Sequence, residues 1–229
     1  MSDATDPRYP VQAPGWAAID RAVGLLHPGQ VPHQFTSESA YDLAGRAPLP
    51  AITVWEGRGP DHWLYVTYGL TELFDKSSPR ADVSGFGFEL TLRLRRDAEE
   101  ARPPEWPLRL LQGVGHFVLS GHPLDSGHCI DLGGPLTPDG DTALTGLIVV
   151  PDPALGKMNT PHGTVLFLAA FGLTADELRA VFEWELRRKV GLVHEVAPAL
   201  IIDPARPPLA ADPKTGPAWR RHALNILLD

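Results

Sequence analysis

Few residues in this chain belong to the types that mark a specialised class of protein. Of its 229 residues only one is a cysteine, Cys129, and only two are methionines. A single cysteine excludes a scaffold held together by disulfides and is typical of a reducing compartment. No apolar run approaches the roughly 20 residues of a membrane-spanning helix, so we expect no membrane partner.

The start of the chain lacks the apolar stretch of a signal peptide. Residues 1–14 are polar and contain three prolines, so we expect a flexible N-terminal segment and a cytoplasmic protein. Basic residues are fewer than acidic ones, 20 against 28, which gives a formal net charge of −8 at pH 7. This acidic balance argues against a nucleic-acid partner, whose phosphates are bound mainly by lysine and arginine.

What remains is sufficient for one ordinary folded domain. Hydrophobic residues make up 43% of the chain and charged residues 21%, close to globular averages. The clearest strand is 85–95, where apolar residues alternate with others over ten positions. Period two predicts one face in the core and one face in solvent, and Glu89 falls on the solvent face. A sheet with one solvated face is usually antiparallel or mixed.

The other expected elements alternate between helices and strands. Helical spacing predicts one helix over 16–26 and a second that begins at Trp106. Thr174 and Glu177 fit a capping box, which predicts a helix from there to about residue 189, with Phe182 and Leu186 inward. Strands are predicted at 52–55, 63–68, 128–132, 146–150, 165–168 and 200–202. The fold class is therefore α+β, with a mixed, largely antiparallel sheet flanked by helices.

The chain divides into three parts by composition. Residues 1–14 form the flexible segment, 15–203 the domain, and 204–229 a proline-rich linker with a short C-terminal helix. That helix, expected over 218–228, is too short to persist alone, since about 12–15 residues are marginal in water. We hypothesise that it docks on the domain in cis; the alternative is that it folds only on a partner.

No arrangement of residues predicts catalysis or a cofactor. The densest group of possible metal ligands is His116, His122, His128 and Cys129, which has one thiol and no closely spaced ligand pairs, so we expect no metal site. His128 and Cys129 are neighbours in a predicted strand and point to opposite faces, so the histidine would not activate the thiol. An alternative is a hydrolase that uses the region of His116, His128 and Asp131. A regulatory scaffold subunit is a further alternative.

A set of motifs, taken in order, resembles the suppressor of fused family. The resemblance spans roughly residues 15–195 and is most specific in the stretch SGFGFELT at 84–91. The other matching motifs are Gly15-Trp16, Tyr68-Gly69-Leu70 with Glu72-Leu73, Trp106-Pro107, Gly127-His128, Asp152-Pro153, Thr160-Pro161 with Gly163, and Gly172-Leu173-Thr174.

The resemblance implies a mixed α/β domain without enzymatic activity. Animal members of the family bind a transcription factor by clamping an extended peptide between two domains, partly by strand pairing. Bacterial members resemble immunity proteins that neutralise polymorphic toxins, and we interpret this chain as such a single-domain member. In the family, the loop before the SGFGFELT strand faces the peptide with an aromatic and an acidic residue. Phe74 and Asp82 are the nearest matches here, so the resemblance implies that they bind the partner.

Overall fold

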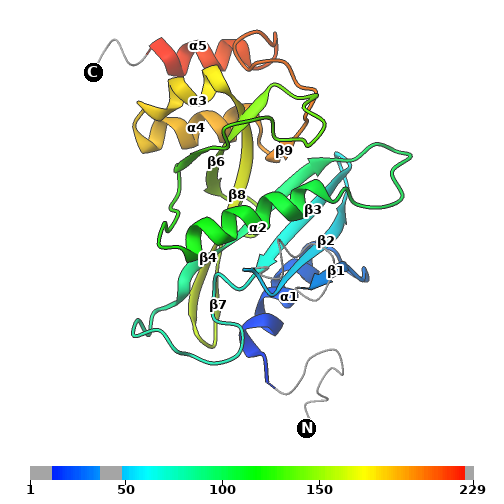
Figure 1. Ribbon diagram of the computed structural model, residues 1–229, viewed down its shortest axis with the longest axis vertical. Helices are drawn as coiled ribbons and strands as arrows, with labels where there is room; N and C mark the ends of the chain where they lie inside the picture. Colours follow the sequence, from blue (N-terminus) through cyan, green and yellow to red (C-terminus); the bar gives the residue numbers. More distant parts are fainter. Residues whose placement is uncertain (1–11, 37–47, 225–229) are drawn as a thin grey trace.

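One mixed sheet organises the molecule (Figure 1). The computed structural model describes residues 12–36 and 48–224. Within these residues the sheet has nine strands in the order β1, β2, β3, β4, β8, β6 and β5, with β7 also paired to β8 and β9 to β4. The strands are β1 His33–Thr36, β2 Ala51–Gly57, β3 His62–Tyr68, β4 Val83–Arg95, β5 Cys129–Asp131, β6 Leu144–Pro151, β7 Lys157–Thr160, β8 Gly163–Thr174 and β9 Ile201–Ile202.

Strand direction confirms the predicted fold class. The central pair β4–β8 and the pair β4–β9 are parallel, whereas the remaining pairs are antiparallel. The predicted strands at 52–55 and 63–68 form the hairpin β2–β3, and those at 146–150 and 165–168 lie within β6 and β8. No pattern predicted β1 and β7, because four residues are too few to show an alternation.

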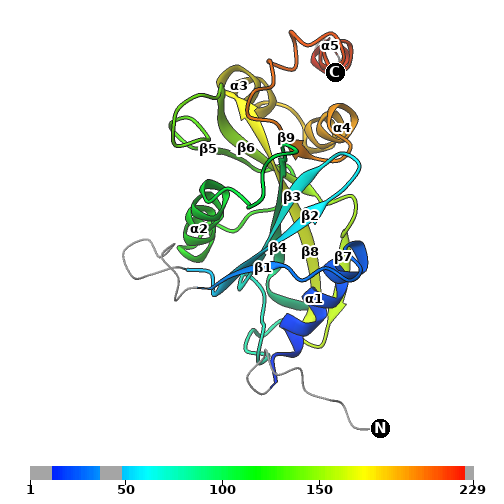
Figure 2. The same ribbon diagram turned by 90° about the vertical axis from the view of Figure 1, so that its right-hand side faces the viewer.

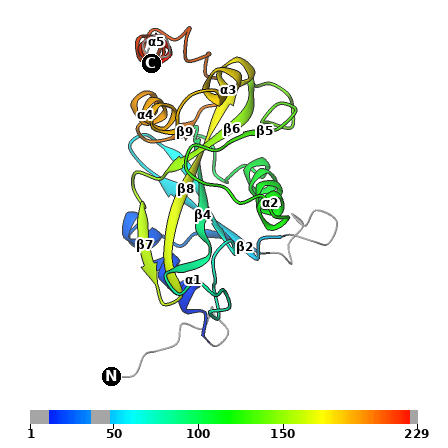
Figure 3. The same ribbon diagram turned by 90° about the vertical axis from the view of Figure 1, so that its left-hand side faces the viewer.

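Helices cover both faces of the sheet. α2 lies across one face, while α1 packs with β7 on the opposite face (Figures 2 and 3). α3, α4 and α5 gather at the end of the sheet that lies opposite the β7–β8 turn. The helices are α1 Pro14–Leu26, α2 Trp106–Leu119, α3 Ala175–Phe182, α4 Leu186–Val196 and α5 Gly216–Leu224.

The structure corrects the prediction that one face of β4 is solvated. Phe88, Leu90 and Leu92 enter the core under α2, as the alternation predicted. The opposite face is also buried, because α1 packs a second apolar core against it; Trp16 of α1 stacks on Tyr68 with 4.8 Å between ring centroids. The polar residues of this β4 face are therefore enclosed, and Glu89 has no exposed surface.

The predicted helix from 174 to 189 is two helices. The capping box at Thr174 and Glu177 is present and starts α3, but α3 ends at Phe182 and α4 begins at Leu186. The break turns the indole of Trp184 into the core, where it is 5% exposed. Phe182 and Leu186 are exposed rather than inward, because they flank this break.

The C-terminal residues pack closely on the domain. The guanidinium of Arg206 donates to both carboxylate oxygens of Glu177, and the backbone N–H of Leu209 donates to the same carboxylate. Farther on, α5 lies against α4, and the rings of Trp184 and Trp219 are 5.3 Å apart. The described part of the tail thus docks in cis, whereas the end of the helix predicted over 218–228 lies outside the described residues.

Candidate functional site

A single loop carries both residues that the family resemblance implied for partner binding. It connects β3 to β4 and comprises residues 69–82. Its first residues are attached to the sheet by the buried carboxylate of Glu89, which accepts hydrogen bonds from the N–H groups of Gly69 (2.9 Å) and Thr71 (3.0 Å). The hydroxyls of Thr71 and Thr67 donate to the same carboxylate. The entry to the loop is therefore fixed by a group inside the molecule.

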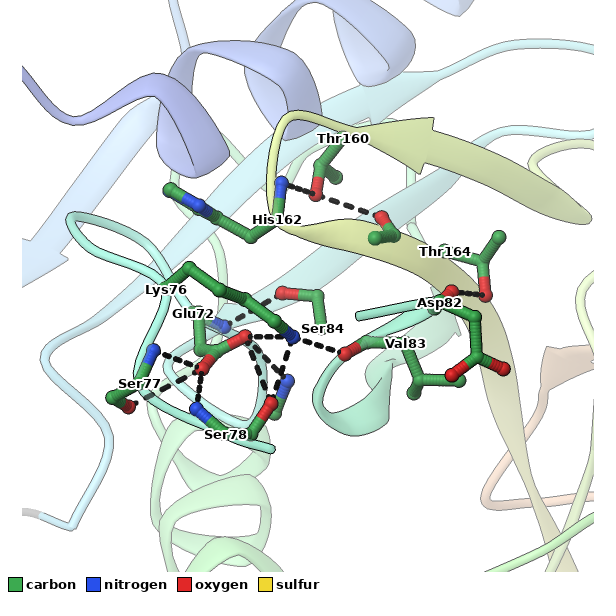
Figure 4. A network of polar contacts seen from close by, with 12 residues as sticks. Glu72, Lys76, Ser77, Ser78, Asp82, Val83, Ser84, Thr160, His162 and Thr164 are labelled. Carbon is green, nitrogen blue, oxygen red and sulfur yellow. Dashed lines mark hydrogen bonds and ion pairs between the residues drawn. The ribbon is translucent and has the colours of Figure 1, made fainter. Parts of the chain in front are cut away.

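A second carboxylate, that of Glu72, organises the middle of the loop (Figure 4). It accepts from the ammonium of Lys76 at 2.8 Å and from the backbone N–H groups of Ser77 (2.7 Å), Ser78 (2.5 Å) and Gly85 (3.1 Å). Burial alone would raise the pKa of Glu72, but these donors hold it well below its usual range. The loop thus folds around a carboxylate that its donors keep ionised at neutral pH.

The turn between β7 and β8 holds the loop from the other side. His162 Nε2 lies 3.0 Å from the carbonyl oxygen of Phe74, and the N–H and hydroxyl of Thr164 both donate to the carbonyl of Asp82 at 2.9 Å. Gly163 permits this approach, since a Cβ there would lie 2.7 Å from the Val83 backbone. We call residues 69–82 the clasped loop, because the turn is hydrogen-bonded to its backbone carbonyls at Phe74 and Asp82.

The side chains of these two residues are exposed, although their backbone carbonyls are held by the turn. The Phe74 side chain is exposed, as is the Asp82 carboxylate, whose nearest charged neighbour is Arg80 at 3.6 Å. An exposed pair of this kind contributes little energy, so the Asp82 carboxylate remains available to another molecule. The structure therefore presents an aromatic ring and a carboxylate from one loop whose backbone is hydrogen-bonded at both residues.

Sequence reasoning missed the residues that shape this surface. Neither Lys76 nor His162 was singled out. Lys76 also donates to the backbone carbonyl of Val83, and His162 meets that of Phe74, 88 residues away, and a contact to a backbone carbonyl leaves no residue pattern in the sequence. The motif Thr160-Pro161 with Gly163 was the available signal. Thr160 Oγ1 donates to the Gly163 carbonyl and accepts from the His162 N–H, which makes the motif a tight turn.

The structure does not assemble the alternative hydrolase site. His116 lies on α2, His128 precedes β5 and Asp131 ends it, and in residues 12–36 and 48–224 no hydrogen bond or ion pair joins any two of them. Burial raises the pKa of the Cys129 thiol, which disfavours the nucleophilic thiolate. Among the described residues there is no group of three or more His, Cys, Asp or Glu placed to hold a metal ion.

Comparison with known proteins gives this architecture a family. The model of the Suppressor of fused protein (SUFU) family matches residues 45–207. The Suppressor of fused homologs of Mus musculus and Homo sapiens are each 32% identical over 209 residues, which is 84% of this chain and 43% of theirs. The sheet and its clasped loop thus form a suppressor of fused domain. The chain belongs to the suppressor of fused family and spans less than half the length of these relatives.

Solved structures agree with this assignment. A chain of the Sufu–Fu complex superposes with a TM-score of 0.80 at 29% identity, covering 93% of this chain and 97% of that one. Drosophila Suppressor of Fused gives 0.81 at 29% identity, over 99% of this chain and 57% of that one. A putative SUFU homolog from Neisseria gonorrhoeae shares the fold at 12% identity, with a TM-score of 0.58 over 85% of this chain and 96% of that one. In the part of this chain that the structure describes, no helix is long and apolar enough to cross a membrane.

Proposed function

We propose that this domain is a non-catalytic, cytoplasmic protein-binding module that takes an extended segment of a partner on the clasped loop. The observation that carries the proposal is the exposed pair of Phe74 and Asp82 on a loop whose backbone is fixed on both sides. A preorganised surface loses little conformational entropy on binding. A structural relative at 29% identity was solved as the Sufu–Fu complex, which supports a protein as the partner.

The two side chains suggest what the partner offers. Phe74 suits an apolar or aromatic side chain, since exposed aromatic rings are frequent anchors of interfaces. Asp82 suits a hydrogen-bond donor or a cation from the same segment, because its own ion pair with Arg80 is weak. We expect an extended peptide rather than a helix, in keeping with strand pairing as the family mode.

The biological setting that we propose is toxin immunity in a bacterium, with the partner a polymorphic toxin. A toxin gene next to the gene for this chain, and survival of cells that co-express both proteins, would support it. If co-expression gives no protection, the immunity role is wrong while the binding role stands. A regulatory scaffold subunit is the second candidate, and stable co-purification with a multi-protein complex would favour it.

The binding role is tested by exchanging the exposed aromatic residue. Proteins captured from the native host are identified by mass spectrometry, and affinities are then measured for the purified partner. We expect Phe74→Ala to weaken binding by about 2 kcal/mol or more, with the melting temperature nearly unchanged, because an interface anchor is lost from an exposed site. Asp82→Asn should weaken binding less.

Phe182→Ala is the matched control. Phe182 is also an exposed phenylalanine, but it lies on α3, far from the clasped loop along the sheet (Figure 1). Its loss should leave affinity unchanged. Equal affinities for Phe74→Ala and the unmodified protein would remove the clasped loop from the interface.

A further inference from the structure

A pocket on the α1 side of the sheet combines residues that have no part in the proposed binding of a protein segment. Its volume of about 390 Å³ is within the range of small-molecule sites. It lies where the end of α1 meets the ends of β2 and β3, away from the clasped loop. Its lining combines apolar residues with imidazole and guanidinium groups: Leu26, His27, Pro28, Gln30, Glu56, Gly57, Arg58, His62, Leu64, Arg93 and Ala154.

Backbone carbonyls fix both imidazoles in one tautomer. Nδ1 of His27 lies 3.0 Å from the Glu56 carbonyl oxygen, and Nδ1 of His62 lies 2.8 Å from that of Pro60. A carbonyl only accepts, so each Nδ1 must carry the proton, and each Nε2 is left free to bind a further group. Neither Nε2 has a hydrogen-bond partner in the described part of the chain.

Packing holds the two rings in place. His27 is 7% exposed and stacks on Trp55, with 5.4 Å between centroids. The ring of His62 lies directly over Gly57, where a Cβ would come within 2.1 Å of it. Gly57 is thus required for the ring to reach this position. Rings held this rigidly lose little entropy when a ligand binds.

Two of the carboxylates near the imidazoles are already paired with arginines. The guanidinium of Arg93, 5% exposed, lies against the pocket and donates to both oxygens of Asp152, at 2.6 and 3.0 Å. Glu56 is paired with Arg96 at 2.8 Å. Glu56 and Asp152 are therefore each paired with an arginine, the carboxylate of Asp61 also acts on His62, and Arg58 is exposed at the rim.

These surroundings lower the pKa of both imidazoles. Burial lowers the pKa of His27 and of His62, and the positive charge of Arg93 lowers both further. The opposing effects are the backbone hydrogen bonds of both rings and, for His62, the carboxylates of Asp61 and Asp152. His62 also lowers the pKa of His27, which means that the two rings are close enough to interact. An anion bound beside the rings would oppose this lowering, because it favours their charged forms.

We propose that this pocket binds a small organic oxyanion, a phosphate ester or a carboxylate attached to an apolar body. The oxyanion contacts His27, His62 and Arg58, while the apolar body packs on Leu26, Leu64 and Ala154. Because the occupied pocket favours protonated rings, binding takes up protons. Affinity therefore rises as the pH falls, by up to about tenfold per pH unit for each proton taken up.

Sulfate, phenyl phosphate and benzoate are suitable probes for calorimetry on the full chain. Sulfate keeps its charge across the pH range, so its pH dependence reports on the protein alone. We expect saturable binding of sulfate that tightens between about pH 7.5 and about pH 5.5, with perturbed NMR signals of His27 and His62. Tighter binding of phenyl phosphate than of benzoate assigns a phosphate ester, and the reverse assigns a carboxylate.

Two variants localise the site. His62→Gln and Arg58→Gln should each weaken sulfate binding by about tenfold, since each removes a charge-assisted hydrogen bond. Arg58 is exposed, so its variant folds even if His62→Gln does not. His122→Gln, which changes an exposed histidine elsewhere, should bind as the unmodified protein does. Non-saturable binding, or equal weakening in His122→Gln, overturns the proposal.

Discussion

Glu72 of the clasped loop and Glu89 of β4 show how two carboxylates that hold the same loop acquire opposite properties. Burial by itself would raise the pKa of both carboxyl groups. At Glu72 the ammonium of Lys76 and three backbone N–H groups outweigh it, so the carboxyl stays ionised. At Glu89 no cation is present among the bonded partners, burial is complete, and its pKa is raised to about 7. The clasped loop is therefore attached through a group that titrates near neutral pH.

The raised pKa of Glu89 makes the free energy of unfolding depend on pH. The pKa of Glu89 is about 7 in the folded protein, against about 4.3 when unfolded, so the folded state binds the extra proton between these values. The free energy of unfolding should then fall by roughly 1–3 kcal/mol as the pH rises from about 4 to about 7. Glu89→Gln should flatten this slope in urea titrations at several pH values.

Asp97→Asn is the matched control, because its carboxylate is exposed and should leave the slope as it is. If Glu89→Gln retains the full slope, Glu89 is not its origin. Glu89→Leu should destabilise far more, by about 3 kcal/mol or above, since it leaves the buried N–H groups of Gly69 and Thr71 unpaired.

At the scale of elements, the C-terminal helices depend on one interruption. Residues 183–185 break the helical path between α3 and α4 and place Trp184 beneath α5. Trp219 meets it there, and Glu195 of α4 pairs with Arg221 and His222 of α5. A nine-residue helix has little stability of its own, so these contacts explain why α5 forms.

Removal of residues 216–229 should therefore lower the melting temperature and expose surface that binds a hydrophobic dye. The cut follows Thr215, which spares the buried contacts of Arg206 and Leu209. A double-mutant cycle of Trp184→Ala and Trp219→Ala should give a coupling energy of about 0.5–1.5 kcal/mol, as for other aromatic pairs. A truncated protein that melts unchanged would show that α5 contributes nothing to the domain.

At the scale of the whole molecule, a sheet with a core on each face separates structural from surface aromatic residues. Phe88 of β4 is 3% exposed and belongs to the core under α2. Phe74, only fourteen positions earlier, is 45% exposed on the clasped loop. The same residue type therefore has two roles that a stability measurement can tell apart.

Phe88→Asp should unfold the domain, because it places an unpaired charge in an apolar interior. Circular dichroism and size-exclusion chromatography are sufficient to detect the loss. Phe182→Asp is the control, since Phe182 is 70% exposed and its variant should remain folded. A folded Phe88→Asp protein would mean that the β4 face under α2 is open to solvent.

The sequence by itself determined most of the elements and the family. Period-two and helical spacing, together with the capping box at Thr174, are local signals that depend only on neighbouring residues. The motif SGFGFELT identified the family for the same reason. It also indicated the segment that carries Phe74 and Asp82, whose role as binding residues stays a prediction.

Only the tertiary structure decided what covers each face and which distant groups meet. The alternation in β4 could not reveal that α1 returns over the second face, so Glu89 was assigned to solvent although it is buried. The break at Trp184 depends on burial against other elements rather than on helix propensity. The contact between His162 and the backbone carbonyl of Phe74 joins residues 88 positions apart, and no local pattern encodes it.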